Sequence, residues 1–335
     1  MKTRQKKHHY LRRLTVVTAT MLTTTMVASP VSHAYVFDEA KFQKGRVPDT
    51  RQAPFSSVVL IVNHATGESG SGVLIGPDTV LTAAHVVMTD REGASDDDWP
   101  TRVANPRNLM IQPAYGGENG SDQERFPFGD GYQGRAISVS PEYLRDAILP
   151  NAPGADPGDH DLAIIHLSRP VPNAQTLTLG ELRAQDIGRE TISAVGFPAT
   201  LGAGSMGEPE NRNDNMYVDS GRAESISTNQ ITTRQVNWSH GSSGGPILNC
   251  FNQVVGVVSS SNSLGNYATR ITPAANCWIQ EAMTDVTGML TPENVRNRWV
   301  SFGNERVYAR MLIKWTDFMH RPLYNYPKTK KEIST

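Results

Sequence analysis

The hexapeptide Gly241-Ser242-Ser243-Gly244-Gly245-Pro246 constrains this chain more than any other stretch. A nucleophilic serine needs an accessible hydroxyl, together with backbone N–H groups aimed at the oxyanion that it generates. Glycines on both sides permit the tight, partly left-handed backbone that turns those N–H groups the same way, and a proline then ends the turn. The stretch predicts Ser243 as the nucleophile, with the N–H groups of Gly241 and Ser243 as an oxyanion hole. A plain Gly/Ser-rich hairpin turn is the alternative.

A catalytic serine also needs a base and an acid, and two other stretches supply them. Residues 79–87 form a short β-rich run in which small residues lead to His85. Asp161 stands immediately before an apolar strand, a position that suits an acid held at a buried strand end. Asp156 and Asp159 compete for the same role, but we expect Asp159 to be a solvated loop acid.

The three motifs T-A-A-H, D-L-A-I-I and G-S-S-G-G-P, in this order, resemble the chymotrypsin-like (trypsin-like) serine proteases. The resemblance runs from about Pro54 to Ile279 and is nearest to the bacterial glutamyl-endopeptidase-like branch. It implies an all-β fold of two antiparallel six-stranded β-barrels, closed by a C-terminal helix. It also implies that His85 is the general base, that Asp161 orients it, and that Ser243 is acylated.

Length and composition fit this expectation. The chain has 335 residues, enough for two small barrels with appendages, and a net charge of −1 with only two cysteines. These values exclude a disulfide scaffold, a disordered chain and a basic nucleic-acid-binding surface. We expect protein or peptide substrates, no nucleic-acid partner, no metal or organic cofactor, and a monomer.

The first 34 residues have the pattern of a secretory signal peptide. A basic stretch without acids precedes an apolar, Thr-rich run, and small residues at the −3 and −1 positions predict cleavage after Ala34. An uncleaved anchor is the alternative, although the run is short for a spanning helix, and no later run is long enough. We therefore expect a secreted protein, extracellular or periplasmic, without stable membrane insertion.

Residues 35–46 are interpreted as a short pro-segment. Lys44-Gly45-Arg46 offers a site for a trypsin-like processing protease, which would leave Val47 as the new N-terminus; an ordinary basic leader is the alternative. In digestive zymogens of the resembled family the freed amine pairs with an aspartate just before the nucleophile. Ser242 occupies that position here, so this ion pair cannot form.

The remaining boundaries follow from pattern and resemblance. The protease domain is expected at 47–284, with barrel one at about 54–168, barrel two at about 185–272, and a closing helix from Pro273 to Met283. Residues 285–335 form an extra C-terminal segment, with helical spacing in 306–318. Strand patterns that support the two barrels lie at 57–63, 72–76, 79–82, 137–143, 191–198, 217–226 and 230–236. A Gly/Ser turn is expected at 67–72.

Acidic, Gly-rich stretches at 90–100 and 116–134 are read as surface insertions. Asp96, Asp97, Asp98 and Asp130 could contribute oxygen ligands to calcium. No Asp-rich calcium loop with a closing acid is present, so a solvated acidic loop is the preferred interpretation.

The preference for the P1 residue of the substrate can be predicted from the residues at two positions of the resembled family. In the resembled family the base of the S1 pocket lies six residues before the nucleophile, where this chain has Asn237 rather than an aspartate. Glutamyl endopeptidases have a histidine where Val258 stands. Both anchors for a charged P1 residue are therefore missing, which predicts a neutral P1. The expected substrate-binding residues are Asn237, Trp238, Ser259, Ser261 and Gly265.

Cys250 and Cys277 flank the last hairpin. In an exported protein two cysteines most simply form one disulfide, worth about 3 kcal/mol for a loop of this length. Two buried thiols are the alternative.

The sequence thus predicts a secreted serine endopeptidase that works through a Ser-His-Asp triad and an acyl-enzyme. A non-catalytic protease homologue that serves as a binding module, and an esterase, remain alternatives.

Overall fold

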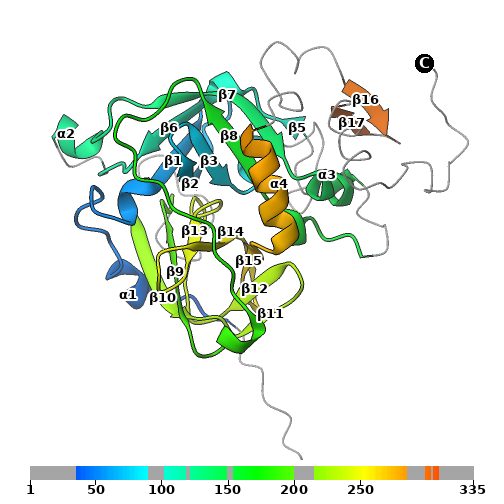
Figure 1. Cartoon of the computed structure of the whole chain (residues 1–335). Helices are drawn as coiled ribbons and strands as arrows, with labels where there is room; N and C mark the ends of the chain where they lie inside the picture. The colour runs from blue at the N-terminus through cyan, green and yellow to red at the C-terminus, as the bar shows by residue number, and fades with distance from the viewer. Residues whose placement is uncertain are drawn as a thin grey trace, which may run out of the picture. The chain divides into compact units, whose positions relative to one another are not determined.

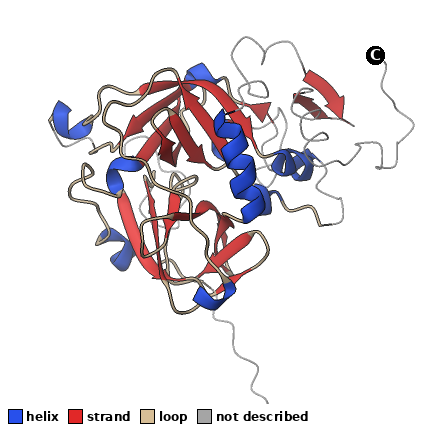
Figure 2. Cartoon of the chain, in the orientation of Figure 1, coloured by secondary structure: helices blue, strands red, loops and turns tan. Residues whose placement is uncertain are grey.

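The computed structural model describes residues 35–89, 102–117, 121–148, 154–199, 215–284, 299–302 and 305–308. The chain divides into two units, 1–33 and 34–335, and every described residue belongs to the second. Strands dominate the described residues (Figure 2). No helix among them is long and apolar enough to cross a membrane. The expected signal peptide and the 90–100 insertion, including Asp96–Asp98, lie outside the described residues.

Six antiparallel strands close the first barrel in the order β1-β2-β3-β8-β7-β6. Their bounds are β1 Val58–Asn63, β2 Ser69–Gly76, β3 Thr79–Thr82, β6 Leu109–Pro113, β7 Tyr132–Val139 and β8 Ala163–Leu167. The first three follow one another through short turns, whereas β8 is reached only after a long excursion and pairs with β3. This pairing brings the end of β3 next to the start of β8, which positions the site described below.

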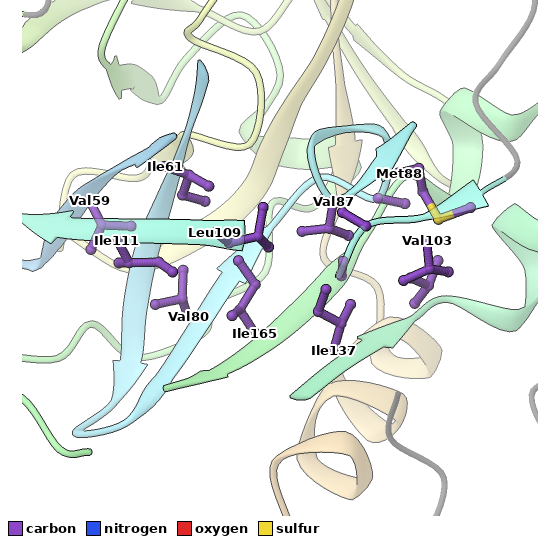
Figure 3. Packing of buried hydrophobic residues seen from close by; sticks show 14 of the residues in the cluster. Val59, Ile61, Val80, Val87, Met88, Val103, Leu109, Ile111, Ile137 and Ile165 are labelled. Atoms are coloured by element: carbon purple, nitrogen blue, oxygen red, sulfur yellow. The ribbon is translucent and has the colours of Figure 1, made fainter. Parts of the chain in front are cut away.

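Strand β1 is apolar on both faces, and its successive residues serve two different cores. Val59 and Ile61 fill the barrel interior together with Val80, Leu109, Ile111, Ile137 and Ile165 (Figure 3). Val58 and Leu60, which alternate with them along β1, point outward into a second core that includes residues of the other sheet. The near-continuous apolar run in β1 therefore reflects burial on both sides.

The second half is a curled seven-stranded sheet of order β10-β9-β13-β14-β15-β12-β11. Its strands are β9 Thr191–Gly196, β10 Tyr217–Arg222, β11 Ser225–Ile226, β12 Gln230–Thr233, β13 Pro246–Leu248, β14 Val254–Asn262 and β15 Gly265–Arg270. The expected chymotrypsin-like fold is confirmed, but here a curled sheet replaces a closed six-stranded barrel. The outer edge of β10 pairs with residues 45–47, through Val218 N to Gly45 O and Val47 N to Met216 O, instead of with β11.

Helix α4, Pro273–Thr284, is the expected closing helix and packs beside β8 (Figure 1). Ile279 is buried on it, and His166 Nε2 of β8 lies 3.0 Å from the carbonyl oxygen of Ala282. The other α-helices are short: α1 Glu39–Gln43, α2 Asp122–Arg125 and α3 Pro141–Ile148. The short 3-10 helices and the two small strands of residues 35–284 are η1 Phe55–Ser57, η2 His85–Val87, η3 Pro106–Asn108, η4 Pro157–His160, η5 Ala184–Asp186, β4 Met88–Thr89 and β5 Arg102–Val103.

Three local predictions are wrong. The expected turn over 67–72 is shorter, because β2 already begins at Ser69. The strand expected over 137–143 stops at Val139, and α3 begins at Pro141, with the Ser140 hydroxyl accepting a hydrogen bond from Tyr143 N. In the C-terminal segment, the hairpin β16 Trp299–Phe302 and β17 Glu305–Tyr308 replaces the helical start expected at 306.

The expected disulfide between Cys250 and Cys277 is also wrong, since both are free, exposed thiols. Cys250 lies in the turn after β13, where its Sγ and its N–H both donate to Glu190 Oε1 at 3.3 Å. That hydrogen bond raises the pKa of the Cys250 thiol. Cys277 lies on α4 instead, so each cysteine is held by a different element.

Both thiols are therefore expected to react with iodoacetamide in the native protein without reductant, adding two carbamidomethyl groups by intact mass. Cys250 should react more slowly than in a Glu190→Gln variant, because less of it is thiolate. The free energy of unfolding of the double variant Cys250→Ser/Cys277→Ser should lie within about 1 kcal/mol of that of the parent. Loss of a disulfide would instead lower it by about 3 kcal/mol. If iodoacetamide left the mass of the protein unchanged, the two cysteines would have to form a disulfide.

Candidate active site

His85 follows β3 in a loop that small residues allow to be buried. Thr82 ends the strand, and its hydroxyl donates to the carbonyl oxygen of Ser71 at 2.7 Å. Ala83 and Ala84 are fully buried, so larger side chains could not be accommodated there without rearrangement. His85 then opens the short helix η2, with part of its side chain exposed.

Asp161 meets His85 from the start of β8. Its side chain is fully buried, and its two oxygens are both directed at His85. Oδ2 lies 2.7 Å from the ring Nδ1, and Oδ1 accepts the backbone N–H of His85 at 2.9 Å. This double contact fixes the imidazole and makes Nε2 the ring nitrogen that can take up a proton. Asp161, rather than Asp156 or Asp159, holds the histidine.

Ser259 is a third member of this network. Its hydroxyl donates to Asp161 Oδ2 at 2.6 Å from β14, and so binds the acid rather than standing free for substrate. A buried carboxylate must have its hydrogen-bonding capacity met, and this contact satisfies part of that of Asp161.

The pKa of His85 is raised above its usual value of 6.5. Burial opposes the charged imidazole, but the charge of Asp161 and its hydrogen bond together outweigh that opposition, with a small further contribution from the charge of Glu68. His85 is therefore a stronger base than an isolated histidine, as a proton acceptor in catalysis requires.

Ser243 lies in a loop whose shape depends on two glycines with positive φ, Gly241 at +88° and Gly244 at +83°. The N–H groups of Ser242, Gly244 and Gly245 are used within the protein, by Ser239 O, Val258 O and Ser242 O respectively. Within the described part of the chain, those of Gly241 and Ser243 donate to nothing. They are the two N–H groups predicted to form the oxyanion hole, and the Ser243 residue is partly accessible.

Ser71 on β2 ties this loop to the first barrel, and the sequence reasoning missed it. Its hydroxyl donates to Gly241 O at 2.7 Å and accepts Phe197 N at 2.8 Å, while its own N–H donates to Ser243 O at 2.7 Å. The two contacts of the hydroxyl are buried, and the third contact is made to Ser243 itself. Ser71 fell inside a stretch read as a turn, and a lone serine between glycines gave no other signal.

The predicted substrate-binding residues lie just before the nucleophile loop and on strands β14 and β15. Asn237 and Trp238 are buried, and Trp238 Nε1 donates to Ser260 O at 3.2 Å. Ser261 is exposed on β14, where it pairs with Asn266; Gly265 is buried at the start of β15. Among the described residues no group of three or more His, Cys, Asp or Glu side chains is arranged to hold a metal ion, and Asp130 stands apart from any such group.

Comparison with known proteins agrees with this geometry. The trypsin-like peptidase domain family matches residues 70–257, which include His85, Asp161 and Ser243. Glutamyl endopeptidases from strains of Staphylococcus epidermidis are 26% identical over 219 residues, covering 62% of this chain. The chain covers 61% of the length of these relatives.

A solved structure of a Glu endopeptidase in complex with MPD has the same fold. It superposes with a TM-score of 0.54 at 20% identity, covering 72% of this chain and 96% of that structure. The family match spans more than half of the present chain and contains every motif that suggested the resemblance. The chain belongs to the trypsin-like peptidase domain family, and its relatives place it near the glutamyl endopeptidases.

Proposed function

We propose that the protein is a secreted serine endopeptidase that hydrolyses peptide bonds through Ser243, His85 and Asp161. The contact that carries the proposal is the buried carboxylate of Asp161, bound to both Nδ1 and the backbone N–H of His85. A surface ion pair would not need a fully buried acid or the second hydrogen bond from Ser259.

In the proposed reaction His85 Nε2 removes the proton from Ser243 Oγ as that oxygen attacks the peptide carbonyl. The carbonyl oxygen becomes an oxyanion that accepts hydrogen bonds from Gly241 N and Ser243 N. His85 then gives its proton to the leaving amine, and the acyl group remains on Ser243. Water, deprotonated by His85, attacks the ester and releases the acid and the free serine.

Secretion and substrate choice belong to the same proposal. The relatives are named glutamyl endopeptidases, but this chain has Val258 and Asn237 at the two positions where an ionic partner for P1 would be expected. We therefore propose a neutral P1 residue, and export to the extracellular space or the periplasm through residues 1–34.

The test is intact mass after incubation with a fluorophosphonate, a reagent that modifies only activated serines. We expect one adduct on the parent and on Ser242→Ala, the neighbouring serine, but none on Ser243→Ala. Casein cleavage should accompany the adduct. An adduct with ester hydrolysis but no casein cleavage would favour an esterase, and no adduct at all would favour a non-catalytic binding module.

A further inference from the structure

The N-terminal segment Tyr35–Arg46 is built into the described fold. Helix α1 begins after Asp38, whose side chain accepts a hydrogen bond from Lys41 N. Phe42 on this helix is 2% exposed and stacks on Tyr217 of β10 with ring centroids 5.2 Å apart. With residues 45–47 bonded to the edge of β10, the segment covers apolar surface and an otherwise open sheet edge.

The segment also saturates one side of Asn237. The hydroxyl of Tyr35 donates to Asn237 Oδ1 at 3.0 Å, and the backbone N–H of Asp38 donates to the same oxygen at 3.1 Å. An amide oxygen accepts two hydrogen bonds, so this acceptor is fully used by the segment. Asn237 therefore cannot offer its oxygen to a substrate while the segment is in place.

The other side of Asn237 leads to an ion pair between the buried Asp219 and the partly exposed Lys41. Asn237 donates to Asp219 Oδ2 through its backbone N–H at 2.7 Å and its side-chain Nδ2 at 2.6 Å. Asp219 is 5% exposed, and its second oxygen lies 2.8 Å from Lys41 Nζ. Lys41 completes its three hydrogen bonds with the carbonyl oxygens of Ser220 and Gln235, so it is a committed partner of the carboxylate.

In the resembled family the base of the S1 pocket lies six residues before the nucleophile, which here is Asn237, so this network borders the expected P1 position. Asn237 leads into the nucleophile loop, and Asn266 Nδ2 donates to Val236 O from the strand opposite Ser261. Ser259, nearby on β14, touches Asp161, while the hairpin tip beyond it binds Tyr35 through Ser263 O.

We propose that Lys41 and Tyr35 are positioning residues for P1 specificity, and that the N-terminal segment stays in the mature enzyme instead of being removed as a pro-segment. Lys41 neutralises Asp219, so the charges behind Asn237 cancel and a neutral P1 side chain is favoured. Loss of the segment after cleavage at Arg46 would take Lys41 away from the Asp219 carboxylate and remove the stacking of Phe42 on Tyr217. This inference rests on the proposed function, because it concerns the substrate of the same site.

The test uses fluorogenic peptides that differ only at P1, with Leu, Arg or Glu. Lys41→Met leaves a lone carboxylate near P1 and should raise the Arg/Leu ratio of kcat/KM about tenfold, mostly through KM. Asp219→Asn leaves a lone ammonium and should raise the Glu/Leu ratio. The double variant should return both ratios toward those of the parent. Tyr35→Phe should raise KM for the Leu peptide several-fold with kcat nearly unchanged.

Lys44→Met is the matched control, because it removes the same charge from the same segment at an exposed side chain. It should leave both ratios unchanged. Equal ratios in Lys41→Met and Lys44→Met would overturn the proposal, as would an active mature enzyme whose mass begins at Val47. If Lys41→Met does not fold, the Glu/Leu ratio of Asp219→Asn is compared with that of the double variant instead. Failure of the parent to react with diisopropyl fluorophosphate would contradict the proposed function instead.

Discussion

Replacing Asp161 with Asn is expected to lower kcat/KM on peptide substrates by about 10⁴-fold without unfolding the protein. An asparagine is the same size, and its Oδ1 can still accept the backbone N–H of His85. Its NH₂ group would donate to His85 Nδ1, which places the ring proton on Nε2. His85 would then present a donor, not an acceptor, to Ser243, and the serine proton would have nowhere to go.

The pH profile separates this effect from simple loss of structure. In the parent, kcat/KM should fall as pH drops through the pKa of His85, which lies above 6.5 because the Asp161 charge and hydrogen bond outweigh burial. Only the neutral imidazole accepts a proton, so activity is lost on the acid side. Asp161→Asn removes both favourable contributions and keeps the burial, so the acid limb of its residual activity should move to lower pH.

Asp159→Asn is the control for this prediction, since Asp159 is the neighbouring acid that competes for the role in the sequence. Its backbone N–H donates to Asp156 O within the turn before β8, and kcat/KM should stay within about threefold of the parent. If Asp159→Asn lost activity and Asp161→Asn kept it, the assignment of the orienting acid would be wrong.

The motifs could be read from sequence because each one is local. The end of β3 with its small residues, and the acid directly before the apolar β8, are both patterns within a few positions, and the structure brings them together. The strands of the first barrel were predictable for the same reason. The Pro77-Asp78 turn, for example, joins β2 to β3 where turn-forming residues interrupt two β-branched runs.

The supporting contacts could not be read because their partners are far apart in the chain. Ser71 and Gly241 are separated by 170 positions, and Tyr35 and Asn237 by 202. No periodicity or spacing encodes such a pair; it exists only after the two halves have packed. In the N-terminal segment only Lys44-Gly45-Arg46 could be interpreted, as a processing site, because the contact between Lys41 and the buried Asp219 also joins distant parts of the chain.

The cysteines were mispredicted for a different physical reason. Pairing two cysteines in an exported protein is a rule about oxidising compartments, and it does not consider geometry. Here one cysteine is held in a turn by Glu190 and the other lies on α4, so the number of cysteines was no substitute for their positions.

Gly244→Ala is expected to be the most damaging small substitution in the nucleophile loop. Gly244 has a φ of +83°, which an L side chain adopts only with strain. An added Cβ would also collide with the hydroxyl of Thr82 and the carbonyl oxygen of Ser71. Thr82 ends the strand that leads to His85, and Ser71 lies on β2 and binds Ser243 O, so the glycine is where the two halves of the site touch.

Gly67→Ala provides the matched control, because Gly67 has nearly the same φ, +78°, but nothing within 4 Å of an added Cβ. Gly67→Ala should cost about 1 kcal/mol of unfolding free energy from backbone strain alone. Gly244→Ala should cost at least about 3 kcal/mol. Urea denaturation gives both values, and fluorophosphonate labelling should slow by about 10²-fold or more in Gly244→Ala only, because a displaced loop turns the two N–H groups away from the oxyanion. Equal losses in the two variants would mean that left-handed backbone, and not contact between the barrels, is what this glycine provides.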